Sequence, residues 1–181
     1  MRVRRLRSDE RSWKVSTLEQ GWGSTHVARL GESIDAATLP GFVATVAGER
    51  VGLLTFADRA DRADGVEVVT IQALLQGRGV GRALMDEVHL HAISLDAKRL
   101  WLITTNDNTR AAAFYERWGM NLKRTIPDGV AISRGVKPTI PLVGISGTVM
   151  RDELEFERRL SARPAARVSV RTLRDSVGYG S

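Results

Sequence analysis

The sequence predicts a single α/β domain with a mixed, mostly antiparallel β-sheet and helices on both faces of the sheet. Three observations indicate this fold class. Strand-like and amphipathic helical segments alternate in the middle of the chain, a β-hairpin pattern precedes them, and a pair of strand-like segments follows. The chain has 181 residues, of which 43% are hydrophobic and 27% charged, a composition typical of one globular domain that buries its own core.

The first third of the chain combines strand-like and helical patterns. Ser8 is a suitable N-cap, and Asp9 and Glu10 favour a helix because acidic side chains in the first turn face the positive end of the helix dipole. β-prone runs on either side of Gly48 indicate a hairpin. In order, the pattern predicts a strand at 3–7, a helix from Ser8 to about Gln20, a break at 21–25, a short strand at 26–31, a loop to residue 41, and hairpin strands at 42–47 and 51–57.

The rest of the chain is dominated by two helices, each of which follows an apolar strand. At about 100° per residue, Val80, Leu84, Val88, Ala92 and Leu95 share one face of the first helix. In order, the pattern predicts an exposed loop at 58–65, a strand at 66–75, a helix at 80–95, a strand at 99–104, a helix at 109–118 closed by Gly119, a strand at 121–126, a short helix near Val130 within a loop region at 127–150, and a closing strand at 153–157.

The positive charge lies at the two ends of the chain. The formal net charge is +6, but residues 1–14 hold six basic and two acidic side chains, residues 161–181 hold four and one, and the part between them has a net charge of −1. Basic termini can bind nucleic acid, yet solvated termini are the simpler explanation. We therefore expect a domain at 1–160, a loose basic tail at 161–181, and no nucleic-acid partner.

Composition also excludes several classes of site. The chain has no cysteine, which excludes disulfides, thiolate metal sites and a cysteine nucleophile, and its three histidines make an all-histidine metal site difficult to build, so we expect no metal. No apolar run approaches the roughly 18 residues that cross a bilayer. The basic N-terminus lacks the apolar stretch of a secretory signal. We expect a cytoplasmic protein with no membrane partner.

A glycine-rich turn at 76–81 is the most informative segment. It lies between a predicted buried strand and a predicted amphipathic helix, and its sequence is Gln-Gly-Arg-Gly-Val-Gly. Such a turn exposes backbone N–H groups, and the helix that follows adds its own unpaired N–H groups and the positive end of its dipole. The segment therefore predicts an anion site, for which a pyrophosphate is the usual ligand.

The spacing of this turn disfavours two common nucleotide sites. A Walker loop requires a lysine after its last glycine, and none is present here. The dinucleotide fingerprint requires a glycine where this chain has Arg82, and the strand before the turn lies in the middle of the chain. What remains is the pattern Gln/Arg-x-x-Gly-x-Gly/Ala, which Gln76, Gly79 and Gly81 satisfy. A turn that binds nothing is the alternative.

A second motif makes the chain resemble the GNAT superfamily of acyl-CoA-dependent N-acyltransferases. That family often has Asn-x-x-Ala-x-x-x-Tyr-x-x-x-Gly after its fifth strand, and Asn108, Ala111, Tyr115 and Gly119 fill these positions. Met120 stands where phenylalanine is common. The two motifs occur in the family's order and setting. The resemblance covers roughly residues 1–160, although only 66–120 is specific.

The resemblance implies a fold with splayed central strands and acetyl-CoA as co-substrate. The end of the central strand would pair through its backbone with the pantetheine arm, and amides of the glycine turn would hold the pyrophosphate. Asn108 would touch the arm. The implied CoA-binding residues are Ala73, Leu74, Leu75, Gln76, Gly77, Arg78, Gly79, Val80, Gly81, Arg82 and Asn108.

The chemistry of acyl transfer suggests roles for three further groups. An oxyanion forms as an amine attacks the thioester, and the amide of Leu74 is our candidate donor to it. The resemblance places Tyr115 beside the sulfur, where its hydroxyl can protonate the leaving thiolate. An aromatic packed at the edge of the core is the alternative. Glu67 opens the central strand, where the family often keeps a carboxylate that acts directly or through water, so the resemblance makes it the candidate base that deprotonates the amine; a solvated strand end is its alternative.

The acceptor side departs from the common family layout. Two helices often form the substrate wall there, but this chain has a glycine-containing break and a short strand, and its insert at 127–150 is expected near the same pocket. Trp22, Ser24 and His26 are the candidate acceptor residues, with a turn packed by tryptophan as the alternative. We expect His91 to pack on the apolar face of its helix and His89 to face solvent. Asp107 is the expected cap of the second helix.

The sequence therefore favours an N-acetyltransferase that moves an acetyl group from acetyl-CoA to a primary amine of a small molecule, peptide or protein by direct attack. The alternative is a non-catalytic acyl-CoA-binding or nucleic-acid-associated protein with the same fold. Dimers are common in the family, and the residues do not decide whether this chain forms a homodimer.

Overall fold

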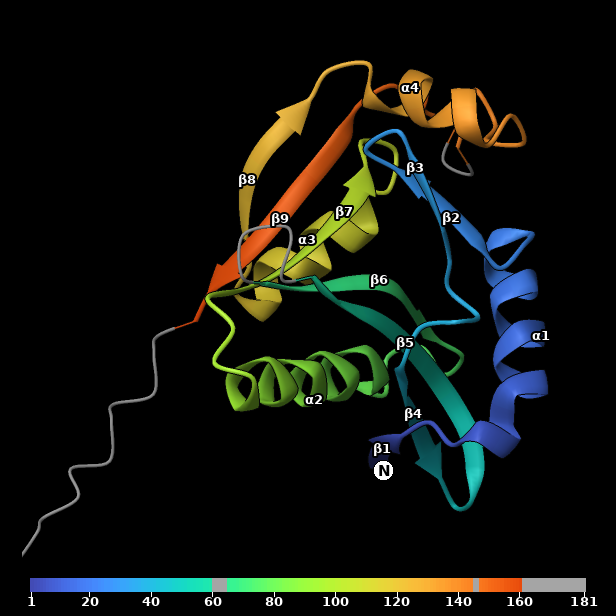
Figure 1. The fold of residues 1–181 in the computed structure, drawn as a ribbon, viewed down its shortest axis with the longest axis vertical. Helices are drawn as coiled ribbons and strands as arrows, with labels where there is room; N and C mark the ends of the chain where they lie inside the picture. Colours follow the sequence, from blue (N-terminus) through green and yellow to red (C-terminus); the bar gives the residue numbers. More distant parts are fainter. Residues whose placement is uncertain (60–64, 145–146, 161–181) are drawn as a thin grey trace, which may run out of the picture.

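A seven-stranded sheet forms the centre of the molecule (Figure 1). The computed structural model describes residues 1–59, 65–144 and 147–160, so the predicted tail and most of the loop predicted at 58–65 lie outside the described residues. All neighbouring strands are antiparallel except β6 and β7, which confirms the mixed, mostly antiparallel sheet. In spatial order the strands are β1 (Arg2–Arg5), β4 (Gly41–Val46), β5 (Glu49–Arg59), β6 (Gly65–Ala73), β7 (Arg99–Thr105), β9 (Glu153–Arg159) and β8 (Asn121–Ile126).

Helices cover both faces of this sheet, as predicted. α2 (Val80–Ser94) and α3 (Thr109–Trp118) pack on one face and share a large apolar cluster with Leu54 of β5. α1 (Arg11–Trp22) packs on the other face in a second cluster with Leu53. Neighbouring strand residues point to opposite faces, so these two leucines mark the two sides. The α1 side also carries the hairpin β2 (His26–Arg29) and β3 (Glu32–Asp35), which contacts α4 (Gly129–Val136).

The N-terminal helix differs from the prediction at both ends. Ser8 does not cap it but opens a short 3₁₀ helix, η1 (Ser8–Glu10), in which the Glu10 carboxylate accepts a hydrogen bond from the backbone N–H of Arg7 at 3.0 Å. The predicted break begins too early. α1 continues through Gly21 to Trp22, and Gly23, with a φ of 71°, provides the left-handed C-cap.

The predicted loop after residue 31 contains a strand, β3, that the sequence pattern did not indicate. It pairs with β2 through a two-residue turn, in which Leu30 and Gly31 have φ values of 52° and 71°. Positive φ at both central residues is the geometry that matches strand twist in a tight hairpin, and asparagine followed by glycine is its usual signal. This chain has Leu30 in place of the asparagine, so its sequence lacks the usual signal for such a turn.

Two predicted elements extend too far. β6 ends at Ala73, and the Leu74 and Leu75 side chains that we included in it are 42% and 43% exposed. α2 ends at Ser94, and Leu95, which we placed on its buried face, is 49% exposed at the C-cap. The predicted α3, β8, α4 and β9 are present with the expected boundaries or close to them.

The two parallel strands diverge towards their C-terminal ends, which confirms the expected splay (Figure 1). β6 and β7 pair from Gly65–Arg99 to Val68–Leu102 and no further. Beyond that point β6 continues to Ala73 against β5, and β7 continues to Thr105 against β9. The sheet therefore contains an opening between two strands whose facing backbone groups have no strand partner.

Candidate functional site

A cavity of about 570 Å³ opens where β6 and β7 diverge. It extends from the glycine turn and the first turn of α2, past one side of α3, to the end of α1. Of the residues expected at the site, its wall includes Trp22, Ala73, Leu75, Gln76, Gly77, Gly79, Val80, Gly81, Arg82, Asn108 and Tyr115. It does not include Ser24, His26, Glu67, Leu74 or Arg78.

The glycine turn presents an open backbone surface to this cavity. Gly77 and Gly79 have φ values of 71° and 74°, a left-handed conformation that favours glycine. A Cβ at either position would meet no atom within 4 Å. Gly79 is the N-cap of α2, which has neither a side-chain cap nor an acidic residue in its first turn. The N–H groups at the start of α2 therefore remain available to an anionic ligand.

Three arginine side chains line the helical side of the cavity. Arg82 from α2 and Arg110 and Arg117 from α3 contribute to its wall. Arg110 also donates a hydrogen bond to the Gln76 side-chain oxygen at 2.7 Å, which ties the glycine turn to α3. Guanidinium groups and a helix N-terminus together suit a ligand with several negatively charged oxygens.

The backbone of β6 corrects one expected role. The N–H of Leu74, our candidate oxyanion donor, donates to the Val51 carbonyl at 2.8 Å and is directed away from the cavity. Backbone groups of an antiparallel strand alternate in direction, so the N–H groups of Ile71 and Ala73 face the side where β7 has diverged. Both residues line the cavity, and their amides are the geometrically suitable donors.

Tyr115 lies at the inner end of the cavity. Its side chain is only 7% exposed, and its ring packs against Phe114 and Phe156 at centroid distances of 5.4 and 5.9 Å. Burial raises the pKa of the Tyr115 hydroxyl above its ordinary value, because a phenolate would lose hydration there. The hydroxyl therefore keeps its proton at neutral pH. The ring of Tyr115 also belongs to the apolar core, so this residue both packs in the core and lines the cavity.

Asn108 caps α3, a role that we had expected of Asp107. The Asn108 side-chain oxygen accepts a hydrogen bond from the Ala111 N–H at 3.2 Å. Asp107 instead accepts from the Thr105 hydroxyl. The first residue of the Asn-x-x-Ala motif therefore starts the helix that carries Tyr115, and it also lines the cavity.

Glu67 is buried, not a solvated strand end, and it is ion-paired. Its side chain is 1% exposed, and its two carboxylate oxygens accept hydrogen bonds from Nε and Nη2 of Arg29, each at 2.7 Å. Arg29 belongs to β2 and also donates to Glu32 at 3.1 Å. The Arg29 guanidinium therefore engages both carboxylate oxygens of Glu67.

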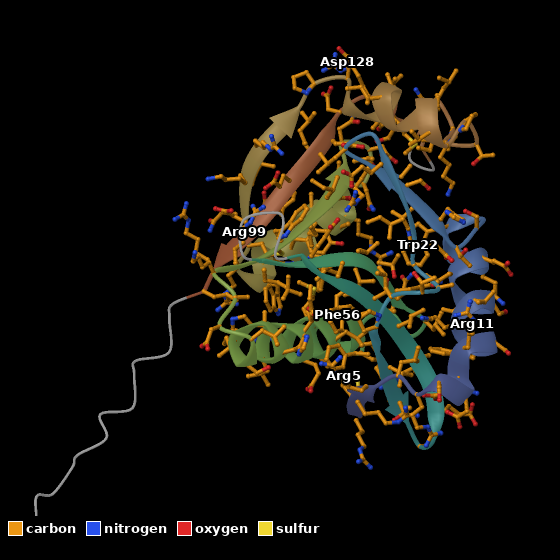
Figure 2. The ribbon with its side chains drawn as sticks, in the orientation of Figure 1. Arg5, Arg11, Trp22, Phe56, Arg99 and Asp128 are labelled. Carbon is orange, nitrogen blue, oxygen red and sulfur yellow. The ribbon has the colours of Figure 1, made fainter. Side chains whose placement is uncertain are left out.

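On the acceptor side, the structure brings Trp22 to the cavity but not Ser24 or His26. Figure 2 shows Trp22 between α1 and the sheet. The Ser24 hydroxyl donates to the His26 carbonyl at 3.2 Å, so both serve the turn after α1. Lys137, which follows α4, donates to the same carbonyl at 2.7 Å. The 127–150 insert thus supports the segment that carries Trp22.

The remaining histidines lie outside the cavity wall. His91 packs on the apolar face of α2 against Phe56 at a centroid distance of 4.8 Å, as expected. His89 is not directed to solvent as predicted. Its ring meets the edge of Trp118 at 5.6 Å, and burial lowers its pKa. Within the part of the chain that the structure describes, no cluster of three or more histidine, aspartate or glutamate residues suits a metal ion.

Sequence reasoning missed several residues of the cavity. Of the missed α3 residues, Ala111 lies one turn before Tyr115 on the same side of the helix, and Arg110, Phe114 and Arg117 follow one another at spacings of four and three residues along the adjoining side. This helical spacing was the signal that could have identified them. The β6 and β7 residues carried no such signal, because their role depends on where the two strands separate. These residues are Val69, Thr70, Ile71, Ile103 and Thr104.

Comparison with known sequences identifies a family and relatives. A family model described as the acetyltransferase (GNAT) family matches residues 5–120. The uncharacterized protein YdhI of Bacillus subtilis (strain 168) is 33% identical over 138 residues, which cover 76% of this chain and 84% of that protein. The described residues contain no helix that is long and apolar enough to cross a membrane.

Solved structures share the fold at low sequence identity. An IAA acetyltransferase from Bacillus cereus ATCC 14579 has a TM-score of 0.64 and 17% identity, over 88% of this chain and 99% of that one. A GNAT family acetyltransferase from Elizabethkingia anophelis, crystallised with acetyl-CoA bound, has a TM-score of 0.58 and 18% identity, over 68% of this chain and 77% of that one.

Proposed function

The chain belongs to the GNAT family of acetyltransferases, and on this premise we propose that it transfers an acetyl group from acetyl-CoA to a primary amine of a small molecule, peptide or protein. The observation that carries the proposal is the continuity of one cavity, which joins the open glycine turn to Tyr115 through the gap between β6 and β7. The acetyl-CoA bound in the Elizabethkingia anophelis structure supports the choice of donor.

The donor side of the cavity fits acetyl-CoA. We propose that the N–H groups from Gly77 to Arg82 hold the pyrophosphate, with Gln76 held in place by Arg110. The pantetheine arm, which contains amide groups, would extend along the unpaired edge of β6 at Ile71 and Ala73. Asn108 and Val80 would contact the arm from either side of the cavity, whereas the exposed Leu74, Leu75 and Arg78 would lie at its mouth.

The reaction joins an amine nitrogen to the acetyl carbonyl carbon, and the carbon–sulfur bond breaks. The N–H of Ile71 would stabilise the negative charge that develops on the carbonyl oxygen, whereas the N–H of Ala73, nearer the glycine turn, would bind the pantetheine arm. Tyr115 would give its hydroxyl proton to the departing sulfur and regain a proton from the attacking nitrogen. The products are an amide and free CoA, with no covalent enzyme intermediate.

The sequence analysis predicts Glu67 as the base that deprotonates the amine. Because Arg29 occupies both carboxylate oxygens, we propose that Glu67 positions the β2–β3 hairpin rather than moving a proton. The other expected roles of the acceptor side change accordingly: Trp22 is the proposed acceptor contact, and Ser24 and His26 shape the turn behind it.

Binding of acetyl-CoA, measured by calorimetry, is the decisive experiment. Gly79→Glu would place a carboxylate in the proposed pyrophosphate site and should abolish binding. Gly48→Glu is a matched control, because Gly48 also has a positive φ of 88° and open space around its Cβ position, but it lies in the β4–β5 turn. Equal affinities in the wild type and Gly79→Glu, or no binding at millimolar acetyl-CoA, would overturn the proposal.

A non-catalytic acyl-CoA-binding protein is the second candidate, and the Arg29–Glu67 pair favours it by occupying the expected base. An amine screen separates the two functions. Because the chain has no cysteine, a thiol-reactive dye reports only released CoA. Amine-dependent release indicates the enzyme, and binding without release indicates the binding protein. The cytoplasmic location and the absence of a nucleic-acid partner stay predictions of the sequence, and whether the chain forms a homodimer stays open.

A further inference from the structure

The cavity crosses the sheet, and its far end differs chemically from the end at the glycine turn. Trp22 and Val69 pack with the apolar cluster on the α1 face of the sheet. Ile103 follows Leu102, which belongs to the cluster on the opposite face, so alternation directs Ile103 to the α1 face as well. We call the cavity wall formed by Trp22, Val69, Thr70 and Ile103 the acceptor wall.

The acceptor wall offers mainly apolar surface to a ligand. Three of its four side chains are hydrophobic, and one of these is a tryptophan ring. The remaining one, Thr70, is 3% exposed, and its hydroxyl shares a hydrogen bond of 2.7 Å with the hydroxyl of Thr55. Its polar group therefore already has a partner within the sheet, which leaves little at this wall to bind a strongly hydrated group.

The charged groups of the cavity lie at the other end. Arg82, Arg110 and Arg117 come from α2 and α3, on the face opposite α1. Among the lining residues that the structure describes, none is a carboxylate. Glu67 is buried nearby on β6, but its ion pair with Arg29 satisfies it. An ammonium ion at the acceptor wall would lose hydration without gaining an ion pair.

From this arrangement we propose that the acceptor is a primary amine carried on an apolar or aromatic body that packs on Trp22, and that it binds as the neutral amine. The inference rests on the proposed function. An apolar site lowers the pKa of a bound amine because it disfavours the charged form. The proton therefore leaves to water before or during binding. The free nitrogen lone pair can then attack without a carboxylate base, which accounts for a cavity in which none is available.

The test compares small amines as probes in acetyl-CoA turnover. The apolar probes are 2-phenylethylamine and n-hexylamine, and the comparison probes are ethylamine, which lacks the apolar body, and spermidine, which has several charges. One methylene in a hydrophobic pocket changes kcat/KM by about 10- to 200-fold. We therefore expect at least a tenfold preference for the apolar probes over both comparison probes.

Two tryptophans of α1 supply the matched variants. Trp22→Ala removes the aromatic part of the acceptor wall, whereas Trp13→Ala removes a ring that packs with the same cluster but lies outside the cavity wall. Trp22→Ala should reduce the preference for apolar probes at least tenfold and leave the Kd for acetyl-CoA within twofold. Trp13→Ala should preserve the preference, so any general loss of stability in α1 appears in both variants.

The outcomes separate this inference from the proposed function. If the wild type binds no acetyl-CoA, the proposed function fails and the inference fails with it. If acetyl-CoA binds but spermidine or ethylamine is preferred, or no apolar probe is acetylated, only the inference is overturned. A preference that survives Trp22→Ala unchanged also overturns it.

Discussion

Arg29 and Glu67 form a buried, two-pronged ion pair that joins the β2–β3 hairpin to the central strand just before the sheet opens. Nε and Nη2 of Arg29 each lie 2.7 Å from a different oxygen of Glu67. The tip of the same hairpin is held separately, because Glu153 accepts hydrogen bonds from the Leu30 N–H at 2.9 Å and from the Ser133 hydroxyl. The hairpin is therefore fixed to β6 and β9, and it contacts α4.

Replacement of Glu67 by glutamine should affect stability more than proton transfer. Glu67→Gln leaves the Arg29 guanidinium buried without its full counter-charge, and loss of one partner of a buried pair costs about 3 kcal/mol or more. Urea unfolding measures this cost, with the exposed Glu116→Gln as the control. The kcat of the folded variant should keep its dependence on pH. Loss of the acidic limb of the profile, with unchanged stability, would instead identify Glu67 as the base.

Removal of the Tyr115 hydroxyl should slow turnover without loosening the site. Tyr115→Phe keeps the ring contacts with Phe114 and Phe156 but removes the proton donor. General acid catalysis contributes about 100-fold or more, so kcat should fall by at least about 100-fold. Because burial raises the pKa of this hydroxyl, the wild type should show no ionisation of Tyr115 near neutral pH. A kcat close to that of the wild type would reduce Tyr115 to a packing residue.

Substitutions of Asn108 should separate its two functions. Asn108→Ala removes the cap of α3, and such losses cost about 1 kcal/mol. Asn108→Asp keeps an oxygen that can accept the Ala111 N–H bond, so thermal stability should remain close to that of the wild type. If Asn108 also contacts the CoA arm through its amide, calorimetry should show weaker acetyl-CoA binding in both variants. If Asn108→Asp binds acetyl-CoA with wild-type affinity, capping of α3 is the only role that remains for Asn108.

The stability of the N-terminal segment should depend on pH through Glu10. Hydrogen bonds from Arg4 at 2.7 and 2.9 Å hold the pKa of the Glu10 carboxyl at about 2, below its usual 4.5. A depressed pKa means that the folded state favours the carboxylate. This stabilisation is complete above about pH 4.5 and is lost as the pH falls towards 2. Hydrogen bonds from arginine side chains also lower the pKa values of Asp152 and Glu157, so the difference between the wild type and Glu10→Gln is the quantity to follow by urea unfolding.

The exposed neighbour Asp9 provides the control for that measurement. Its side chain is 69% exposed in a surface ion pair with Arg7. Asp9→Asn should leave the acid-induced loss of stability nearly unchanged, because exposed pairs contribute little. The assignment to Glu10 fails if Asp9→Asn and Glu10→Gln remove the same part of the pH dependence.

Most of the regular elements could be predicted because their signals are local. Helical spacing from Val80 to Ala92 and the left-handed glycine after α3 identify the two helices beside the cavity, and both are present. The failures occur where the local signal is weak or misleading. Leu30 occupies a left-handed position that usually takes asparagine, which concealed β3, and Gly21 is accommodated inside α1 rather than ending it.

The sequence by itself determined the glycine turn, the motif on α3 and the order of strands and helices, because these depend on residues within a few positions of one another. Only the tertiary structure decided which groups are available for chemistry. It pairs Glu67 with Arg29, which lies 38 residues away, and it directs the Leu74 N–H to β5 while Ile71 and Ala73 face the gap. A side chain or amide acquires such partners from strand order and register, and these follow from packing of the whole sheet rather than from any short stretch of the chain.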